Sequence, residues 1–326
     1  MKKKIKWGVL GLGGIAHKFI ADLLLEENAT LHGVASRSIE KAKGFASTYN
    51  CPNYYNSYDD LVNNDEIDII YIATTHHLHA ENTLLCLNHK KAVLCEKPFA
   101  INKKQVLKMI QASKENSTFL MEALWTRFIP GMLKIKEMID NNVIGEVKYI
   151  NADFSFKSDL KNPRIYDISL GGGSLLDIGI YPIFLTYLLL GKPKQINAQA
   201  HYFETGADSQ LSMLFNYESA MAVLYSSFHS TSKRLAKISG TKGEIIIDAP
   251  WNETESFSLI TEEGEQKYEY DKTGRGYTHQ ITECHKCLLE EKTESSIWSH
   301  QNSIDLISIQ DDVRKIIGLK YYEDNA

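Results

Sequence analysis

The chain lacks the features that would direct it to a membrane, to nucleic acid or into a disulfide-stabilised fold. Only five of its 326 residues are cysteines, too few for a disulfide framework in a chain of this length. No run approaches the ~20 consecutive apolar residues of a membrane helix, and the apolar stretch after the basic N-terminus is short and broken by glycines. The formal net charge of −5 provides no basic surface for nucleic acid or an anionic membrane. We therefore expect a cytoplasmic protein without nucleic-acid or membrane partners.

The first thirty-five residues contain a glycine pattern in an informative setting. Residues 5–10 read as a short apolar strand, and the turn Gly11-Leu-Gly13-Gly14-Ile15-Ala16 leads into a helical pattern that ends near residue 25. A second strand at 30–35 completes a βαβ unit. Gly11 permits a tight turn, Gly13 lets the backbone approach a pyrophosphate, and Ala16 keeps the helix close to the strand. A glycine-rich turn without a ligand is the alternative, but the βαβ setting favours dinucleotide binding.

Strands and helices alternate as far as residue 122. We predict strands at 67–73, 92–95 and 118–121 and helices at 80–88 and 103–116. This alternation predicts a doubly wound parallel sheet, whose ligand lies beyond the carboxyl ends of the strands. The residues that follow those ends, and that we therefore expect to border the cofactor, are Thr74, Thr75, His76, His79, Glu96, Lys97 and Pro98.

After residue 122 the pattern changes to one helix at 128–141 followed by many short strands. The strands are predicted at 147–156, 196–203, 208–216, 220–227, 234–240, 244–248 and 256–261. Short strands separated by turn residues indicate an open, mostly antiparallel sheet. We therefore predict an α/β protein with a Rossmann domain at 1–122 and a substrate-binding and dimerisation domain at 123–326. An open sheet leaves one face to cover, which favours a homodimer.

Two groups of potential metal ligands are incomplete. Cys284 and Cys287 have CxxC spacing near His279, but no second pair of ligands closes a zinc site, and 278–291 reads as a helix. The histidines at 76, 77 and 79 follow a strand beside the nucleotide motif, so we assign them to the cofactor loop. We predict no metal site.

The end of the second strand indicates which nicotinamide cofactor binds. An NAD-specific fold usually has an acidic residue there, whereas this chain has Ser36-Arg37-Ser38, with Lys41 one turn later and no carboxylate before Glu40. An arginine beside two hydroxyls can hold a 2′-phosphate through charge-assisted hydrogen bonds. This favours NADP(H); NAD(H) stays possible if Arg37 lies over the adenine ring instead.

A second glycine run precedes two candidate catalytic residues. The stretch from Gly171 through Ser174 and Asp177 to Tyr181 places Asp177 and Tyr181 on one face of a helix, if that helix begins at Ser174. The simpler explanations are a capping box between Ser174 and Asp177 and a core role for Tyr181. Neither explains three consecutive glycines, which allow the backbone to approach a ligand closely.

These motifs together resemble the glucose–fructose oxidoreductase/inositol dehydrogenase (Gfo/Idh/MocA) family. The resemblance rests on Gly11-x-Gly13-x-x-Ala16, on Glu96-Lys97-Pro98 and on 171–181. Residues 121–128 (Met-Glu-Ala-Leu-Trp-Thr-Arg-Phe) are similar to its branch of dimeric dihydrodiol dehydrogenase and NADP-dependent D-xylose dehydrogenase. The resemblance implies hydride transfer at a carbon that bears a hydroxyl, with Lys97 as the catalytic lysine and Tyr181 as the acid/base where inositol-type relatives have histidine. Thr75 stands where many relatives have proline. This difference bears on the detailed shape of the cofactor loop, but not on its role.

The chemistry of these residue types agrees with that implication. Free tyrosine titrates near 10, and a nearby ammonium group favours its phenolate, so our hypothesis is that Lys97 and Tyr181 work as one unit. Asp177 would orient Lys97 or a substrate hydroxyl. The residues that we expect to line the substrate are Trp125, Arg127, Phe128, Arg164 and Tyr166, with a core role as the alternative for Phe128.

We therefore predict an NADP(H)-dependent oxidoreductase that acts on a secondary alcohol or ketone of a sugar, polyol or cyclic diol. Two alternatives stay open. One is net reduction of an anhydro- or keto-sugar, and the other is an NADP-binding regulator without redox activity.

Overall fold

The computed structural model describes residues 4–325, and its first sheet contains six strands that all pair in parallel. The strands are β1 Ile5–Leu10, β2 Ala29–Ala35, β3 Asn53–Tyr55, β4 Ile69–Ile72, β5 Ala92–Glu96 and β6 Leu120–Ala123. Their order, β3-β2-β1-β4-β5-β6, is that of a doubly wound dinucleotide-binding sheet. The predicted fold class is confirmed for this part of the chain.

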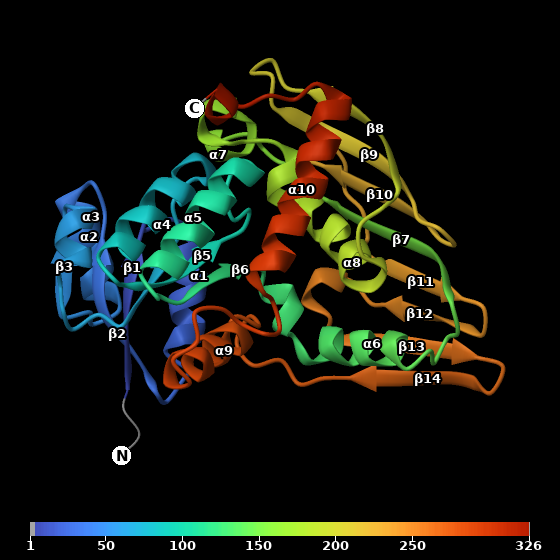
Figure 1. The fold of residues 1–326 in the computed structure, drawn as a ribbon, viewed down its shortest axis with the longest axis horizontal. Helices are drawn as coiled ribbons and strands as arrows, with labels where there is room; N and C mark the ends of the chain where they lie inside the picture. Colours follow the sequence, from blue (N-terminus) through green and yellow to red (C-terminus); the bar gives the residue numbers. More distant parts are fainter. Residues whose placement is uncertain (1–3, 326) are drawn as a thin grey trace. The chain divides into compact units, whose positions relative to one another are not determined.

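Helices cover both faces of this sheet, as right-handed crossovers require. They are α1 Gly14–Leu23, α2 Ile39–Thr48, α3 Tyr58–Val62, η1 His76–Leu78, α4 His79–Asn88, α5 Lys103–Glu115 and α9 Thr278–Leu289. The helices α4 and α5 lie side by side on one face (Figure 1), and α1 packs against α9. Side-chain oxygens of Ser38, Ser57 and Asn102 accept hydrogen bonds at the starts of α2, α3 and α5.

A second sheet of eight strands follows and is mostly antiparallel. Its strands are β7 Val147–Ser155, β8 Gln195–Tyr202, β9 Asp208–Asn216, β10 Met221–Ser227, β11 Ala236–Gly240, β12 Gly243–Ile247, β13 Ser256–Thr261 and β14 Gly264–Glu269. The order is β14-β13-β12-β11-β7-β10-β9-β8, and only β7 and β10 pair in parallel. This confirms the predicted open sheet.

Several helical segments accompany the strands of the second sheet along the chain. They include η2 Trp125–Phe128, α6 Pro130–Asp140, α7 Pro163–Tyr166, η3 Ile168–Leu170, the π-helix η4 Leu175–Gly179, α8 Ile180–Leu190, η5 Trp251–Glu253 and η6 Tyr322–Asn325. The apolar helix α8 contacts β7 and β10 (Figure 1). Along β10, Ala222 and Leu224 are buried whereas Met221 and Val223 on the opposite face are exposed. The alternation is that of a sheet with one face in the core.

By their internal contacts, these elements form two compact units. The first comprises the chain up to Trp125 together with Thr273–Ile304, and the second comprises Thr126–Lys272 and the chain from Asp305. The helix α10 His300–Ile317 contributes residues to both. The return of 273–304 to the first unit has no counterpart in the sequence analysis. The expected domain boundary at 122 stays a prediction, because compactness alone does not show which segments fold independently.

One helical stretch, 168–190, is long and apolar enough to cross a membrane by length and composition. The expectation that no run approaches this length is therefore wrong for this stretch. Of its apolar window, 83% is buried within the structure, which is typical of a core helix.

Candidate cofactor and active site

The turn between β1 and α1 has the backbone geometry that the glycine pattern predicts. Gly11 has a φ of +91°, and a Cβ there would come within 2.8 Å of the Ala73 carbonyl at the end of β4. No side chain caps α1, whose N-cap is Gly13, and a Cβ at Gly13 or Gly14 would meet no atom within 4 Å. An uncapped N-terminus with open space before it suits a phosphate group. Ala16 is buried, and the neighbouring Ile15 is half-buried.

The residues after β2 form the start of α2. Ser36 is buried, and its hydroxyl accepts a hydrogen bond from the Ser38 backbone N–H. The Ser38 hydroxyl is the N-cap, which accepts from the Lys41 N–H at 3.2 Å and donates to Glu40 at 3.0 Å. Arg37 and Lys41 are exposed at this helix start. The two cations are therefore available to a 2′-phosphate, whereas the Ser38 hydroxyl already has a capping role that the sequence analysis overlooked.

His79 connects the loops that follow β4 and β5. Its ring is fully buried, with Nδ1 2.7 Å from the Pro98 carbonyl oxygen and Nε2 3.2 Å from that of Thr74. Burial lowers the pKa of His79 to about 4, so the ring is neutral at physiological pH and donates to one carbonyl, with Pro98 the closer. His76 packs edge-on against it, and Thr75 precedes η1 as its N-cap residue. His79 therefore holds the predicted cofactor loops together.

Backbone contacts also fix the loop that carries Lys97. The buried Glu96 carboxylate accepts hydrogen bonds from the Tyr71 hydroxyl and, at 3.2 Å, from the Lys97 N–H. The Lys97–Pro98 peptide bond is cis, and the Phe99 N–H donates to Glu122 Oε1 at 3.1 Å. The Lys97 side chain is half-buried. Because β5 lies beside β4, this loop and the Thr74 loop share the carboxyl edge of the sheet.

The second glycine run packs against protein atoms. A Cβ at Gly172 would come within 2.8 Å of the Asp167 carbonyl oxygen, and one at Gly173 would overlap Asp208 Oδ1. Gly173 also has a φ of +126°. The interpretation that these glycines let the backbone approach a ligand is therefore wrong for these two positions. Gly172 makes room for the Asp167 backbone, and Gly173 makes room for Asp208, a residue that we missed in the sequence.

Asp208 anchors the helical segment that follows. Its buried Oδ2 accepts from the Ser174 hydroxyl and from the Leu175 N–H, both at 2.7 Å. Burial raises the pKa of Asp208 to about 6, although these donors oppose that rise. The Ser174 side chain caps no helix, so the capping-box alternative is wrong. The predicted α-helix from Ser174 begins instead as a π-helix, a feature that is frequent at functional sites.

The structure brings Asp177 and Arg164 together. Asp177 lies within the π-helix, and its Oδ1 is 3.0 Å from Arg164 Nη1. Tyr181 lies in the first turn of α8, where it is 5% exposed and its ring centroid is 5.3 Å from that of Phe154. From the sequence we assigned Asp177 to catalysis and Arg164 to the substrate, and their contact was not expected.

The residues predicted to line the substrate fall in different surroundings. Trp125 is buried against Tyr277, with ring centroids 5.1 Å apart, and Phe128 is 3% exposed. The burial of Phe128 agrees with the core alternative. Tyr166 packs edge-on against Phe203.

Arg127 is an unusual arginine. Its Nε and Nη1 atoms are buried and have no hydrogen-bond partner among residues 4–325. Burial lowers the pKa of this guanidinium, although the charge of Asp140 opposes that change. Unpaired buried N–H groups are costly, which makes Arg127 a candidate donor to a ligand.

Cys284 and Cys287 are buried in α9, and burial raises the pKa of the Cys287 thiol to about 12. His285 accepts a hydrogen bond from the Trp7 indole at 3.0 Å. In the described part of the chain, no group of three or more potential ligands could hold a metal ion.

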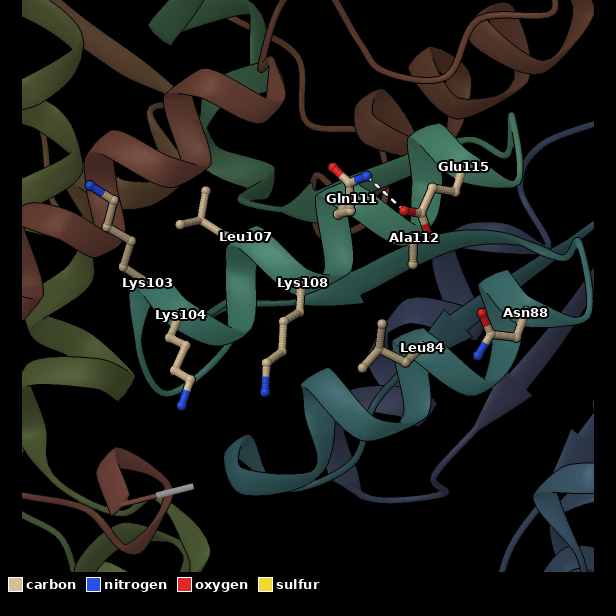
Figure 2. A pocket seen from close by; sticks show the side chains of 9 residues that line it. All are labelled: Leu84, Asn88, Lys103, Lys104, Leu107, Lys108, Gln111, Ala112 and Glu115. Carbon is tan, nitrogen blue, oxygen red and sulfur yellow. Dashed lines mark hydrogen bonds between the residues drawn. The ribbon is translucent and has the colours of Figure 1, made fainter.

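A groove lies between α4 and α5, outside the predicted site. Its lining includes Leu84 of α4 and Lys104, Leu107 and Lys108 of α5, all labelled in Figure 2. No predicted cofactor, catalytic or substrate residue lines it.

Comparisons with known proteins agree with this architecture. Residues 5–124 match the oxidoreductase family with an NAD-binding Rossmann fold (GFO_IDH_MocA), and residues 132–246 match the GFO/IDH/MocA C-terminal domain. The chain is 36% identical over 330 residues to a trans-1,2-dihydrobenzene-1,2-diol dehydrogenase of Xenopus tropicalis, covering 97% of this chain and 99% of that protein.

Two solved structures show the same fold. A 3-ketoreductase from Actinomadura kijaniata, in complex with NADP and TDP-benzene, superposes with a TM-score of 0.88 at 23% identity, over 97% of this chain and 98% of the other. The aldose-aldose oxidoreductase from Caulobacter crescentus gives 0.87 at 24%, over 96% and 97%. The predicted resemblance is confirmed: this chain belongs to the Gfo/Idh/MocA family of oxidoreductases, and it is a dehydrogenase or reductase that uses a nicotinamide dinucleotide.

Proposed function

We propose that the protein transfers a hydride between NADP(H) and a secondary alcohol or ketone of a sugar, polyol or cyclic diol. The observation that carries this proposal is the position of Lys97 on the loop after β5. That loop shares the carboxyl edge of the parallel sheet with the glycine turn of β1. The full-length similarity to a dihydrodiol dehydrogenase supports the substrate class.

The proposed chemistry assigns proton handling to two residues. When bound, the nicotinamide accepts or supplies the hydride. Tyr181 would take the hydroxyl proton during oxidation and return it during reduction. The Lys97 ammonium group would favour the phenolate of Tyr181 and polarise the substrate oxygen. We assign to Asp177, through its ion pair with Arg164, the orientation of a substrate hydroxyl. The unpaired Arg127 N–H groups would donate to another.

Arg37 and Lys41 support the preference for NADP(H). Both cations are exposed at the N-terminus of α2, where the helix dipole also favours an anion. Glu40 lies in the same turn and acts against a phosphate, so the two cations must outweigh it.

A plate assay tests the function. Sugars, polyols and cyclic diols are offered with NADP⁺ or NAD⁺, and the corresponding ketones, including keto- and anhydro-sugars, with NADPH or NADH. Turnover of any of these compounds that prefers NADP(H) supports the proposal. Tight cofactor binding without turnover across the panel would instead favour a regulator without redox activity.

We also propose that a second copy covers the outer face of the second sheet. Tyr149 and Met221 pair across β7 and β10, and both are exposed on that face together with Val223. Val223→Asp should shift the protein to a monomer in sedimentation velocity. The matched control is Leu289→Asp, an exposed leucine in α9, which should leave the sedimentation coefficient unchanged. A wild-type protein that sediments as a monomer contradicts the proposal.

A further inference from the structure

The buried carboxylate of Glu122 accepts hydrogen bonds from three donors that lie in two separate segments of the first unit. Glu122 lies in β6 and is 3% exposed. Its Oε1 accepts from the Phe99 N–H at 3.1 Å. Its Oε2 accepts from the Trp298 indole at 3.1 Å and from the Ser303 hydroxyl at 2.7 Å. Neither Trp298 nor Ser303 is near Glu122 in the sequence.

Burial of a carboxylate in this strand has a desolvation cost that lowers the stability of the fold. Its β5 neighbour in the sheet register is Cys95, and the other residues of β6 are apolar. Burial raises the pKa of Glu122, whereas its three donors and the charge of Lys97 lower it. An apolar side chain would avoid this desolvation, so packing alone does not account for an acid here.

The position of Glu122 suggests what it does. Each residue of the 97–99 segment has a hydrogen bond to a different partner. The Glu96 carboxylate accepts from the Lys97 N–H, and the His79 ring bonds to the Pro98 carbonyl oxygen. The Glu122 carboxylate accepts from the Phe99 N–H. Glu122 supplies the contact that connects this segment to the 273–304 segment, through Trp298 and Ser303.

We propose that Glu122 is a positioning residue for Lys97. By fixing the Phe99 backbone and placing a negative charge near the lysine, it holds the ammonium group in the orientation that catalysis needs. The inference rests on the proposed catalytic role of Lys97. Trp298 and Ser303 in turn orient the carboxylate, as outer partners orient ligands in other active sites.

The variant Glu122→Gln preserves the shape of the side chain and removes its charge. We expect kcat to fall about 10- to 100-fold, the range typical when a residue that orients a functional group through a hydrogen bond is lost. The Kd for NADPH and the KM for substrate should change less than about threefold, because the cofactor loops themselves are intact. The matched control is Glu115→Gln, an exposed glutamate at the end of α5 that accepts a hydrogen bond from Gln111, and it should leave kcat unchanged.

A double-mutant cycle separates positioning from a general structural role. If Glu122 acts through Lys97, Glu122→Gln should cost less than about twofold further in single-turnover rate when it is added to Lys97→Arg. Losses that multiply, or a single Glu122→Gln variant with the wild-type kcat, overturn the inference. Full activity of Lys97→Met would instead refute the proposed function.

A second variant tests the inference if Glu122→Gln does not fold. Trp298→Phe keeps the aromatic packing and removes one donor to Glu122 Oε2. It should lower kcat with the Kd for NADPH unchanged, and this loss should also vanish in the Lys97→Arg background. Wild-type kcat in a folded Trp298→Phe protein, or a loss that persists in that background, contradicts the inference.

Discussion

Arg164 Nη1 lies 3.0 Å from Asp177 Oδ1, and this ion pair joins two residues that were assigned to the site for separate reasons. The Asp177 side chain is 8% exposed and that of Arg164 is 33% exposed, so the carboxylate is the more desolvated partner. Loss of the cation would leave a nearly buried charge without this partner. Arg164 therefore contributes to the site through Asp177.

This ion pair gives a first prediction. Arg164→Met should lower kcat/KM about tenfold, which corresponds to ~1.4 kcal/mol, because the Asp177 carboxylate loses its orientation. Lys161→Met is the matched control, since Lys161 is an exposed cation in the same segment that pairs with the exposed Asp159. Steady-state kinetics of both variants test this. Equal losses in the two variants would show that the segment, and not the ion pair, is responsible.

The second prediction concerns cofactor choice. Arg37→Ala should raise the KM for NADP⁺ at least tenfold and leave that for NAD⁺ within about twofold, because only NADP⁺ carries the 2′-phosphate. Glu40→Gln should act in the opposite direction and improve NADP⁺ binding, since it removes a nearby negative charge. Measured KM values that rise equally for both cofactors would place Arg37 over the adenine.

The third prediction concerns stability and pH. The pKa of Asp208 is about 6 in the folded state, against an ordinary value of 3.8. A raised folded pKa means that the protonated acid is favoured by folding. The contribution of the protonated Asp208 carboxyl to the free energy of unfolding is fully present below pH 3.8. It is lost as the pH rises through about 6. The free energy of unfolding of the wild type relative to Asp208→Asn should therefore fall by about 2 kcal/mol between pH 4 and pH 7. Urea titrations across this interval measure it, and a constant difference contradicts the assignment.

Gly173 provides a fourth prediction. Gly173→Ala combines a left-handed backbone with a Cβ that overlaps Asp208, and should destabilise the fold by about 3 kcal/mol or more. Gly191→Ala is the control, because Gly191 also has a positive φ but a Cβ there meets nothing within 4 Å, so about 1 kcal/mol is expected. Thermal unfolding compares the two. Similar losses would mean that backbone strain alone explains Gly173.

The regular elements were predictable where apolar periodicity and turn residues occur together. The strands β1, β9 and β13 have the predicted bounds. In each of them, apolar residues either alternate with polar ones or follow one another, and turn residues mark both ends. Two strands were missed. β3 has only three residues, and β14 reads Gly-Glu-Gln-Lys-Tyr-Glu, whose polar side chains give no strand signal.

The contacts that hold the site in place were less predictable from the sequence. The motif residues at 11–16 and 96–98 occupy strand ends as expected, because a βαβ pattern fixes where its loops lie. Glu122 and Asp208 were missed because their partners are distant in the chain and no local pattern marks such pairs. For Glu122 the local signal was an acid within an otherwise apolar strand. The π-helix at Leu175–Gly179 likewise begins where the distant Asp208 binds the backbone.

The proposed catalytic pair is tested most directly by the single-turnover rate of hydride transfer in Lys97→Met and Tyr181→Phe, with the Kd for NADPH measured alongside. We predict that each variant loses about 10²- to 10⁴-fold in rate, as expected for removal of a proton-handling group. We also predict that both variants stay folded and bind NADPH with a Kd close to that of the wild type. Hydride transfer at the wild-type rate in both folded variants would contradict the assignment of Lys97 and Tyr181 as the catalytic pair.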